Sequence, residues 1–233
     1  MTTYDLAAAL AAIPTAQRRV EETLATFTDD EARGPSVLPG WTRGHVVTHI
    51  ARNADASVRL VTGALHDTPA DQYPGGIVTR NAEIEAGAGL PAVELATDVA
   101  RTNKVVNAAF GAMTEEAWTR TVQFRQSPFP ARRVAWSRWR EVEIHHADLG
   151  LDRYTIEDWP DEFISAHLPH ELVKLAERLP GGIAVEIRGV RYGSGEPIAV
   201  DGPDHAVLAW LVGRPRLATP YLKTDAPELP FWA

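Results

Sequence analysis

Apolar residues before residue 155 recur mostly at intervals of three, four or seven, which is the spacing of one face of an α-helix. Stretches rich in Gly and Pro interrupt this pattern and mark the connections. Residues 114–130 contain Ser127-Pro-Phe-Pro130 and are expected to be mainly loop. The periodicity predicts helices over residues 4–28, 43–65, 77–86, 91–113 and 138–150. Thr42 is expected to be the N-cap of the second helix, and Gly150 stands where the last one should have its C-terminal cap.

The pattern changes after residue 155, where short alternating segments join the helical ones. The expected elements are a helix over 161–179, strands over 183–190 and 197–200, and a helix over 204–212. The sequence therefore predicts an α+β fold in two parts. A helical domain spans residues 1–155, and a smaller α+β domain spans residues 156–233.

The charge balance excludes some classes of partner. The formal net charge is −8 and the chain has no basic run, which argues against non-specific binding to nucleic acid. No apolar segment is long enough to span a bilayer, and the first residues lack the charged and apolar regions of a signal peptide. We therefore expect a cytoplasmic protein without a nucleic-acid or membrane partner.

The chain contains no cysteine. It therefore has no disulfide, thiolate metal site or cysteine nucleophile, and any thiol chemistry requires a small-molecule thiol. The eight histidines and the carboxylates are the side chains available to bind a metal such as zinc.

Glu141 and His145 are four residues apart, so a helix presents them on one face, one turn apart. Arg138 and Val142 share this face, whereas Glu143 points the opposite way. A carboxylate, an imidazole and a guanidinium are costly to bury unless something pairs with them. The spacing alone is more often an ordinary pair on a surface helix, so a metal site needs a further ligand from elsewhere.

A histidine on the helix predicted over 43–65 offers that ligand. His49 lies at the inner edge of the apolar arc of this helix, whereas His45 lies further out and is expected to be partly exposed or to support a ligand. On the next helix, Arg80 shares a face with Ile77 and Ile84. Such an arginine either extends to solvent, pairs with a glutamate, or binds an anionic ligand.

Three segments, Leu38–Ala54, Arg80–Glu85 and Arg138–Gly150, resemble the mycothiol-dependent maleylpyruvate isomerase family of the DinB-like superfamily. The resemblance extends over nearly the whole chain. It implies an N-terminal DinB-like four-helix bundle that binds a metal, followed by a small C-terminal α+β domain.

The resemblance also implies that Zn²⁺ is bound by His49, Glu141 and His145. Three protein ligands leave a coordination position open, as in catalytic zinc sites, although the same set suits non-haem Fe(II). Asp148 lies beside the ligand face and is expected to orient a ligand by a hydrogen bond. His146 lies too far round the helix to share the metal.

The activity implied by the resemblance is the zinc- and mycothiol-dependent cis–trans isomerisation of maleylpyruvate to fumarylpyruvate, in gentisate-type aromatic catabolism. Mycothiol adds to the double bond, rotation follows, and the thiol leaves. Arg80 and Arg138 are expected to bind carboxylate or enolate groups. Arg188, Arg191 and Arg214 lie near the ends of elements in the second domain, where one could bind the sugar hydroxyls of mycothiol.

Two alternatives remain open at this stage. A mycothiol S-transferase on the same scaffold would add the thiol to an electrophile or xenobiotic without releasing it. A metal- or ligand-binding module without turnover is the other. The fold by itself does not distinguish among the three.

Overall fold

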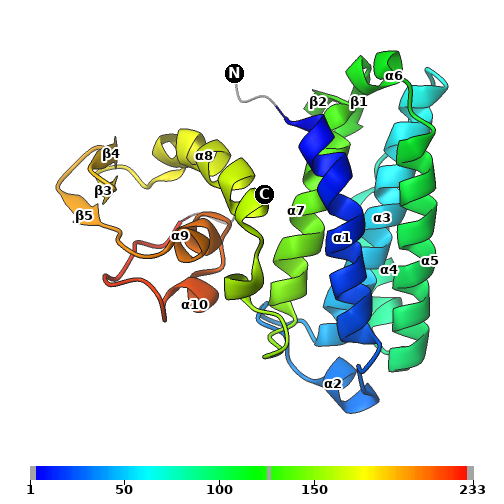
Figure 1. The fold of residues 1–233 in the computed structure, drawn as a ribbon, viewed down its shortest axis with the longest axis horizontal. Coiled ribbons are helices and arrows are strands. Elements are labelled where there is room, and N and C mark those ends of the chain that lie inside the picture. Colours follow the sequence, from blue (N-terminus) through cyan, green and yellow to red (C-terminus); the bar gives the residue numbers. More distant parts are fainter. Residues whose placement is uncertain (1–3, 125–126, 230–233) are drawn as a thin grey trace. The chain divides into compact units, whose positions relative to one another are not determined.

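The computed structural model describes residues 4–124 and 127–229, and the chain divides after Arg153 into two compact units. In the first unit, α1 packs against α7 and α5, and α3 packs against the same two helices, which makes a four-helix bundle (Figure 1). The bundle helices are α1 (Leu6–Leu24), α3 (Arg43–Leu65), α5 (Ala92–Gly111) and α7 (Arg132–Asp148). The expected helical bundle is confirmed, whereas the assignment of the two units as separate domains remains a prediction.

Five shorter elements complete the first unit: α2 (Asp29–Arg33), α4 (Gly76–Ala88), α6 (Glu115–Thr119), β1 (Thr121–Phe124) and β2 (Ser127–Pro130). α4 packs closely against α3 through glycines. A Cβ atom on Gly87 would lie 2.5 Å from Cγ2 of Thr48, and one on Gly44 would collide with the carbonyl of Ala88. Only glycine allows the two helices this approach, which brings α4 and its arginine next to α3.

The expectation that residues 114–130 are mainly loop is wrong. Thr114 accepts a hydrogen bond from the backbone N–H of Ala117 and begins α6, and the antiparallel hairpin of β1 and β2 follows. Pro128 and Pro130 argued against a strand because proline cannot donate a backbone hydrogen bond. In a two-stranded hairpin both strands have a free edge, so proline is tolerated there.

The start of α3 and the end of α7 follow from capping residues. α3 begins after Thr42, whose hydroxyl accepts a hydrogen bond from the backbone N–H of His45, as the sequence predicts. α7 begins at Arg132, earlier than the predicted Arg138, and ends at Asp148. Gly150 follows with φ +62°, the left-handed conformation that terminates helices.

α7 is more deeply buried than a helix with a single apolar stripe, because 13 of its 17 residues are buried. Glu143 does point away from Glu141, but it meets α1, where it pairs with Arg19 at 2.5 Å. His146 also faces α1, and its Nε2 lies 2.7 Å from the hydroxyl of Thr23. α7 therefore presents ionisable side chains to two neighbouring helices.

The second unit has a three-stranded sheet in the order β4-β3-β5, with β4 antiparallel and β5 parallel to β3. The α+β class is therefore confirmed. The single strand predicted over 183–190 is wrong, because Arg188 and Gly189 both have positive φ and form a tight turn between β3 and β4. The elements are η1 (Ile156–Asp158), α8 (Asp161–Arg178), β3 (Ala184–Ile187), β4 (Val190–Gly193), β5 (Pro197–Ala199), α9 (Asp204–Leu211) and α10 (Pro215–Ala218).

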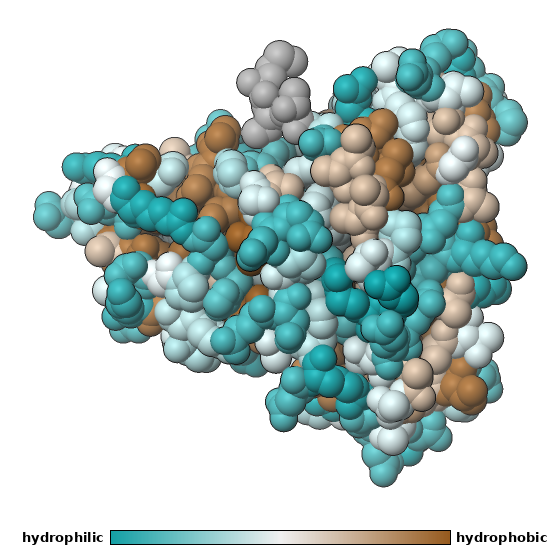
Figure 2. All heavy atoms as spheres, in the orientation of Figure 1, coloured by the Kyte–Doolittle hydropathy of each residue, from teal (hydrophilic) through white to brown (hydrophobic). Residues whose placement is uncertain are grey.

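The surface of the bundle changes character along α1. Figure 2 shows apolar atoms near the start of α1 and hydrophilic atoms towards its end. Arg18 and Glu22, in this second half, are exposed and form an ion pair at 3.5 Å. Within residues 4–124 and 127–229, no helix has the length and apolar character needed to cross a membrane.

Candidate metal centre

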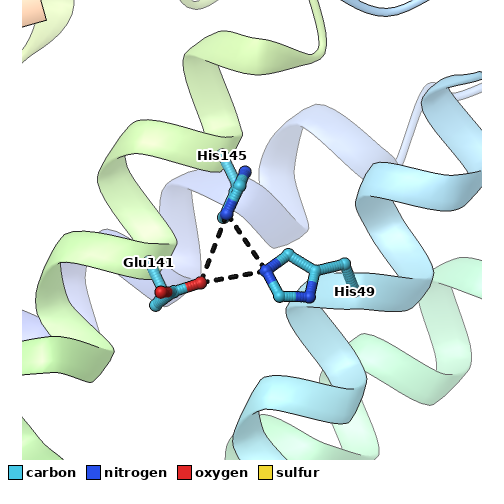
Figure 3. Close-up of side chains that lie close together, drawn as sticks. All are labelled: His49, Glu141 and His145. Atoms are coloured by element: carbon cyan, nitrogen blue, oxygen red, sulfur yellow. Dashed lines mark hydrogen bonds and ion pairs between the residues drawn. The ribbon is translucent and has the colours of Figure 1, made fainter. Parts of the chain in front are cut away.

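Three side chains from α3 and α7 converge inside the bundle (Figure 3). His49 Nε2 lies 2.9 Å from Glu141 Oε2 and 3.0 Å from His145 Nε2. The third side of the triangle, from His145 Nε2 to Glu141 Oε2, measures 3.2 Å. The i, i+4 spacing on α7 supplies two of these groups, and α3 supplies the third.

The chemistry of this triangle suits a cation. Ligands bound tetrahedrally at zinc distances lie roughly 3.3 Å from one another, close to the separations observed. Nδ1 of His145 donates to Oδ2 of Asp148 at 2.8 Å, so a neutral His145 directs its Nε2 lone pair towards the carboxylate of Glu141. The lone pair of His145 Nε2 and the carboxylate of Glu141 face each other at 3.2 Å, and a cation between them would remove their repulsion. The three side chains are 6%, 12% and 10% exposed in chain order, so the cluster is not completely closed to solvent.

Arg43 connects the beginning of α3 to the end of α7. Its Nε donates to the carbonyl of Leu149 at 2.7 Å, and its NH2 donates to the carbonyl of Gly150 at 3.2 Å. These carbonyls belong to the negative end of α7, where a guanidinium is favourable. His49 lies in the first two turns of α3 and His145 in the last turn of α7, so this connection helps to bring the two histidines together.

Burial and hydrogen bonding set the charges of the cluster. Burial lowers the pKa of His49 to about 4, and the neighbouring His145 contributes to this shift. Burial alone would raise the pKa of Glu141, but hydrogen bonds with His145 and His49 outweigh it and hold the pKa well below 4.5. Burial opposes protonation of His145, but Asp148 and Glu141 raise its pKa. Glu141 is thus ionised and His49 neutral at pH 7, the forms that bind metal.

Residues 13–150, which include all three clustered side chains, match the sequence model of the mycothiol maleylpyruvate isomerase N-terminal domain. The chain belongs to this family. Two solved structures are similar to it over 100% of both chains, each with a TM-score of 0.85. They are a mycothiol-dependent maleylpyruvate isomerase at 25% identity and a histidine-to-alanine mutant of a mycothiol-dependent maleylpyruvate isomerase at 24% identity. No curated protein matches the chain.

In this member of the isomerase family, Arg80 lies directly beside the cluster. Its NH2 is 3.0 Å from Nδ1 of His49, its NH1 donates to the side chain of Asn81, and its guanidinium lies 5.6 Å from the ring centre of Tyr73. No carboxylate of residues 4–124 or 127–229 pairs with it. On the face that Arg80 shares with its apolar neighbours, Ile77, one turn earlier, is 60% exposed, whereas Ile84, one turn later, is buried.

Arg138 is fully buried and lies between helices. Its NH1 donates to the carbonyl of Ile50 at 2.8 Å and to Oδ1 of Asn53 at 2.9 Å, and its NH2 donates to Oδ1 of Asn103 at 2.9 Å. Burial lowers its pKa to about 10. These contacts attach α7 to α3 and α5, and a role for Arg138 in binding substrate stays a prediction.

His45 lies outside the cluster, as expected. Its Nδ1 is 2.7 Å from the hydroxyl of Thr42, and its Nε2 is 3.1 Å from Oε2 of Glu85.

Sequence reasoning missed Trp41, whose ring centre lies 5.6 Å from that of His49 and 6.0 Å from that of His45. Its position directly before the N-cap of the helix that carries both histidines was the available signal.

The three arginines predicted to bind the thiol lie in the second unit, in different surroundings. Arg188 forms an ion pair with Asp204. Arg191 donates to the carbonyl of Gly195, and the buried Arg214 donates to the carbonyl of Val212 at 2.8 Å. Their role in binding mycothiol remains a prediction.

Proposed function

We propose that this protein is a zinc- and mycothiol-dependent maleylpyruvate isomerase. The observation that carries the proposal is the cluster of His49, Glu141 and His145 in a chain of the isomerase family. The similarity to a mycothiol-dependent maleylpyruvate isomerase over the full length of both chains supports it.

His49, Glu141 and His145 would hold the zinc ion. When bound, zinc supplies a Lewis acid at the open position, where it lowers the pKa of a thiol or polarises a substrate oxygen. Asp148 keeps His145 oriented for this purpose through the 2.8 Å hydrogen bond. The donor set alone also suits Fe(II), so the choice of zinc rests on the family.

The reaction needs a nucleophile that the chain does not contain, since it has no cysteine. The thiolate of mycothiol adds to the cis double bond of maleylpyruvate, and the electron pair moves to the conjugated carbonyl as an enolate. The former double bond is now single and rotates. Collapse of the enolate expels the thiolate and leaves the trans isomer, so the thiol is regenerated.

Arg80 is the side chain placed to bind a carboxylate or the enolate of the substrate. It is a half-buried cation beside the cluster, and its present partners, His49 and Asn81, are both neutral. A guanidinium binds a carboxylate through two parallel hydrogen bonds, which are stronger than its bonds to neutral acceptors. For Arg138, whose NH1 and NH2 already donate to α3 and α5, we propose a supporting role through these helices.

The second unit would bind mycothiol. Mycothiol is too large for a slot between the helices of a bundle, and its sugar hydroxyls suit arginine donors. Arg188 and Arg191 are exposed, and each makes one of the polar contacts described above. Arg214 is more deeply placed, so its contribution would require a ligand that reaches into the fold.

The decisive experiment incubates the zinc-loaded protein with maleylpyruvate, with and without mycothiol, and follows the absorbance of the conjugated acid. We expect isomerisation only with the thiol, and no net loss of thiol. Stoichiometric consumption of mycothiol would indicate an S-transferase. Absence of any turnover would indicate a metal- or ligand-binding module without catalytic activity.

Variants test the metal ligands separately. His49→Ala, Glu141→Ala and His145→Ala are each expected to lose stoichiometric zinc, measured by elemental analysis after gel filtration. His45→Ala and Glu143→Ala serve as matched controls on the same helices and are expected to retain it. Zinc retained by all three ligand variants would refute the assignment.

A further inference from the structure

The outer nitrogens of the two clustered histidines face groups of opposite charge. Nδ1 of His145 lies 2.8 Å from a carboxylate oxygen of Asp148. Nδ1 of His49 lies 3.0 Å from a guanidinium nitrogen of Arg80. The Nε2 atoms of both rings point to the carboxylate of Glu141. The two histidines therefore differ in the group that their Nδ1 atoms contact.

Asp148 is arranged to support a metal on His145. A histidine that binds a metal through Nε2 carries its proton on Nδ1, and the carboxylate of Asp148 accepts that proton. Asp148 is completely buried and is the last residue of α7, where the helix dipole disfavours a negative charge. A carboxylate in this unfavourable position is explained by its bond to the histidine.

Arg80 has the opposite effect on His49. A guanidinium keeps its protons, so it can donate to Nδ1 only when that atom has a free lone pair. The proton of the neutral ring is then on Nε2, which faces Oε2 of Glu141 at 2.9 Å. A metal on Nε2 of His49 requires the ring proton to be on Nδ1. That N–H would then face the N–H of Arg80, and two donors cannot form a hydrogen bond with each other. Binding of metal by His49 and its contact with Arg80 therefore exclude each other.

We infer that the two histidines are unequal metal ligands. His145, together with Glu141 on the same helix, anchors the ion, and His49 is the weaker ligand because Arg80 opposes its coordination. The inference rests on the metal site proposed above and extends it. When the metal is bound, Arg80 loses its bond to His49, and its NH2 becomes available to an anionic ligand. Loading of the metal and binding of the substrate carboxylate are thereby coupled.

Zinc affinity of the full-length protein, measured by competition with a chromophoric chelator at pH 7 without substrate, tests this order. His145→Ala is expected to weaken zinc binding at least about tenfold more than His49→Ala. Asp148→Asn is expected to weaken it by about 10- to 100-fold. Its amide can turn its NH2 towards Nδ1 of His145, which moves the ring proton to Nε2. Arg80→Met is expected to strengthen zinc binding by at least about tenfold, the value of one hydrogen bond from a charged donor.

Two variants control for loss of charge alone. Glu143→Gln removes another buried carboxylate of α7, and Arg52→Met removes a cation of α3 that pairs with Asp98; both are expected to leave zinc affinity unchanged.

A proton NMR spectrum of the zinc-loaded protein adds a direct signature. The Nδ1–H of His145, bound to Asp148, should resonate far downfield and disappear in Asp148→Asn.

Equal weakening by His49→Ala and His145→Ala, or a greater effect of His49→Ala, overturns the inference. Unchanged or weaker zinc binding by Arg80→Met does the same. If Asp148→Asn does not fold, the two alanine variants and Arg80→Met still decide. A protein that shows the expected order without isomerase activity would refute the proposed reaction alone, whereas wild-type protein that binds no zinc would overturn both proposals.

Discussion

Replacing Arg43 with methionine should loosen the end of α7 on which the metal centre depends. Arg43 donates to the carbonyls of Leu149 and Gly150, the first at 2.7 Å and the second at 3.2 Å at an exposed position. Methionine keeps most of the aliphatic stem but no donor, so the bond from NH1 to the carbonyl of Glu31 at 3.3 Å is lost as well. The carbonyls at the end of α7 would lose both their hydrogen bonds and a favourable positive charge.

The size of the effect follows from these contacts. A hydrogen bond to a charged group contributes about 1.5–3 kcal/mol, and a cation at a helix C-terminus about 0.3–1 kcal/mol. The exposed bond to Gly150 adds little because water replaces it. We therefore expect Arg43→Met to lower the free energy of unfolding by about 2–3 kcal/mol, which corresponds to about 5–10 °C in Tm for a protein of this size.

Urea unfolding of the zinc-free protein, followed by circular dichroism, measures this change. Arg18→Met is the matched control, because the one ion pair of Arg18 among the described residues is an exposed pair with Glu22. This variant should stay within about 0.5 kcal/mol of wild type. An Arg43→Met protein as stable as this control would refute the argument. Zinc affinity should fall together with stability, since His145 lies in the same last turn.

Three further predictions concern activity, pH and the second unit. Arg80→Ala should retain zinc but lower kcat/KM about 10- to 150-fold, because it removes one hydrogen bond from a charged donor to the substrate. Full activity of this variant would show that Arg80 has only a structural role. Hydrogen bonds from Arg153 and from the N–H of Thr28 lower the pKa of Glu31 from 4.5 to about 2. The ionised Glu31 therefore stabilises the fold above pH 4.5, and this contribution disappears as the pH falls from 4.5 to 2. Arg153→Met should remove this part of the acid dependence in urea titrations, and an unchanged profile would contradict it. A chain ending near residue 155 should bind zinc but lose mycothiol-dependent turnover; isomerisation at the full rate would exclude the second unit from the reaction.

Periodicity and capping residues were sufficient for the helices of the bundle, whereas the four-helix arrangement and the set of three ligands were implied by the resemblance to the isomerase family. The bounds of α3, with Thr42 as N-cap, are as predicted, because a long apolar stripe and a cap both act within one helix. The same holds for Glu141 and His145, whose spacing places them on one face whatever surrounds the helix. Gly150 ends α7 as expected, since a left-handed residue there needs only local geometry.

Only the tertiary structure decided how the remaining residues are used. Arg138 shares the ligand face, but its NH1 and NH2 donate to Ile50, Asn53 and Asn103, which come from two other helices. The hairpin with two prolines formed because both of its strands have a free edge. Periodicity tells which side chains share a face of a helix. How much of the helix is covered, and which donors are already bound, depends on neighbours that are distant in the sequence.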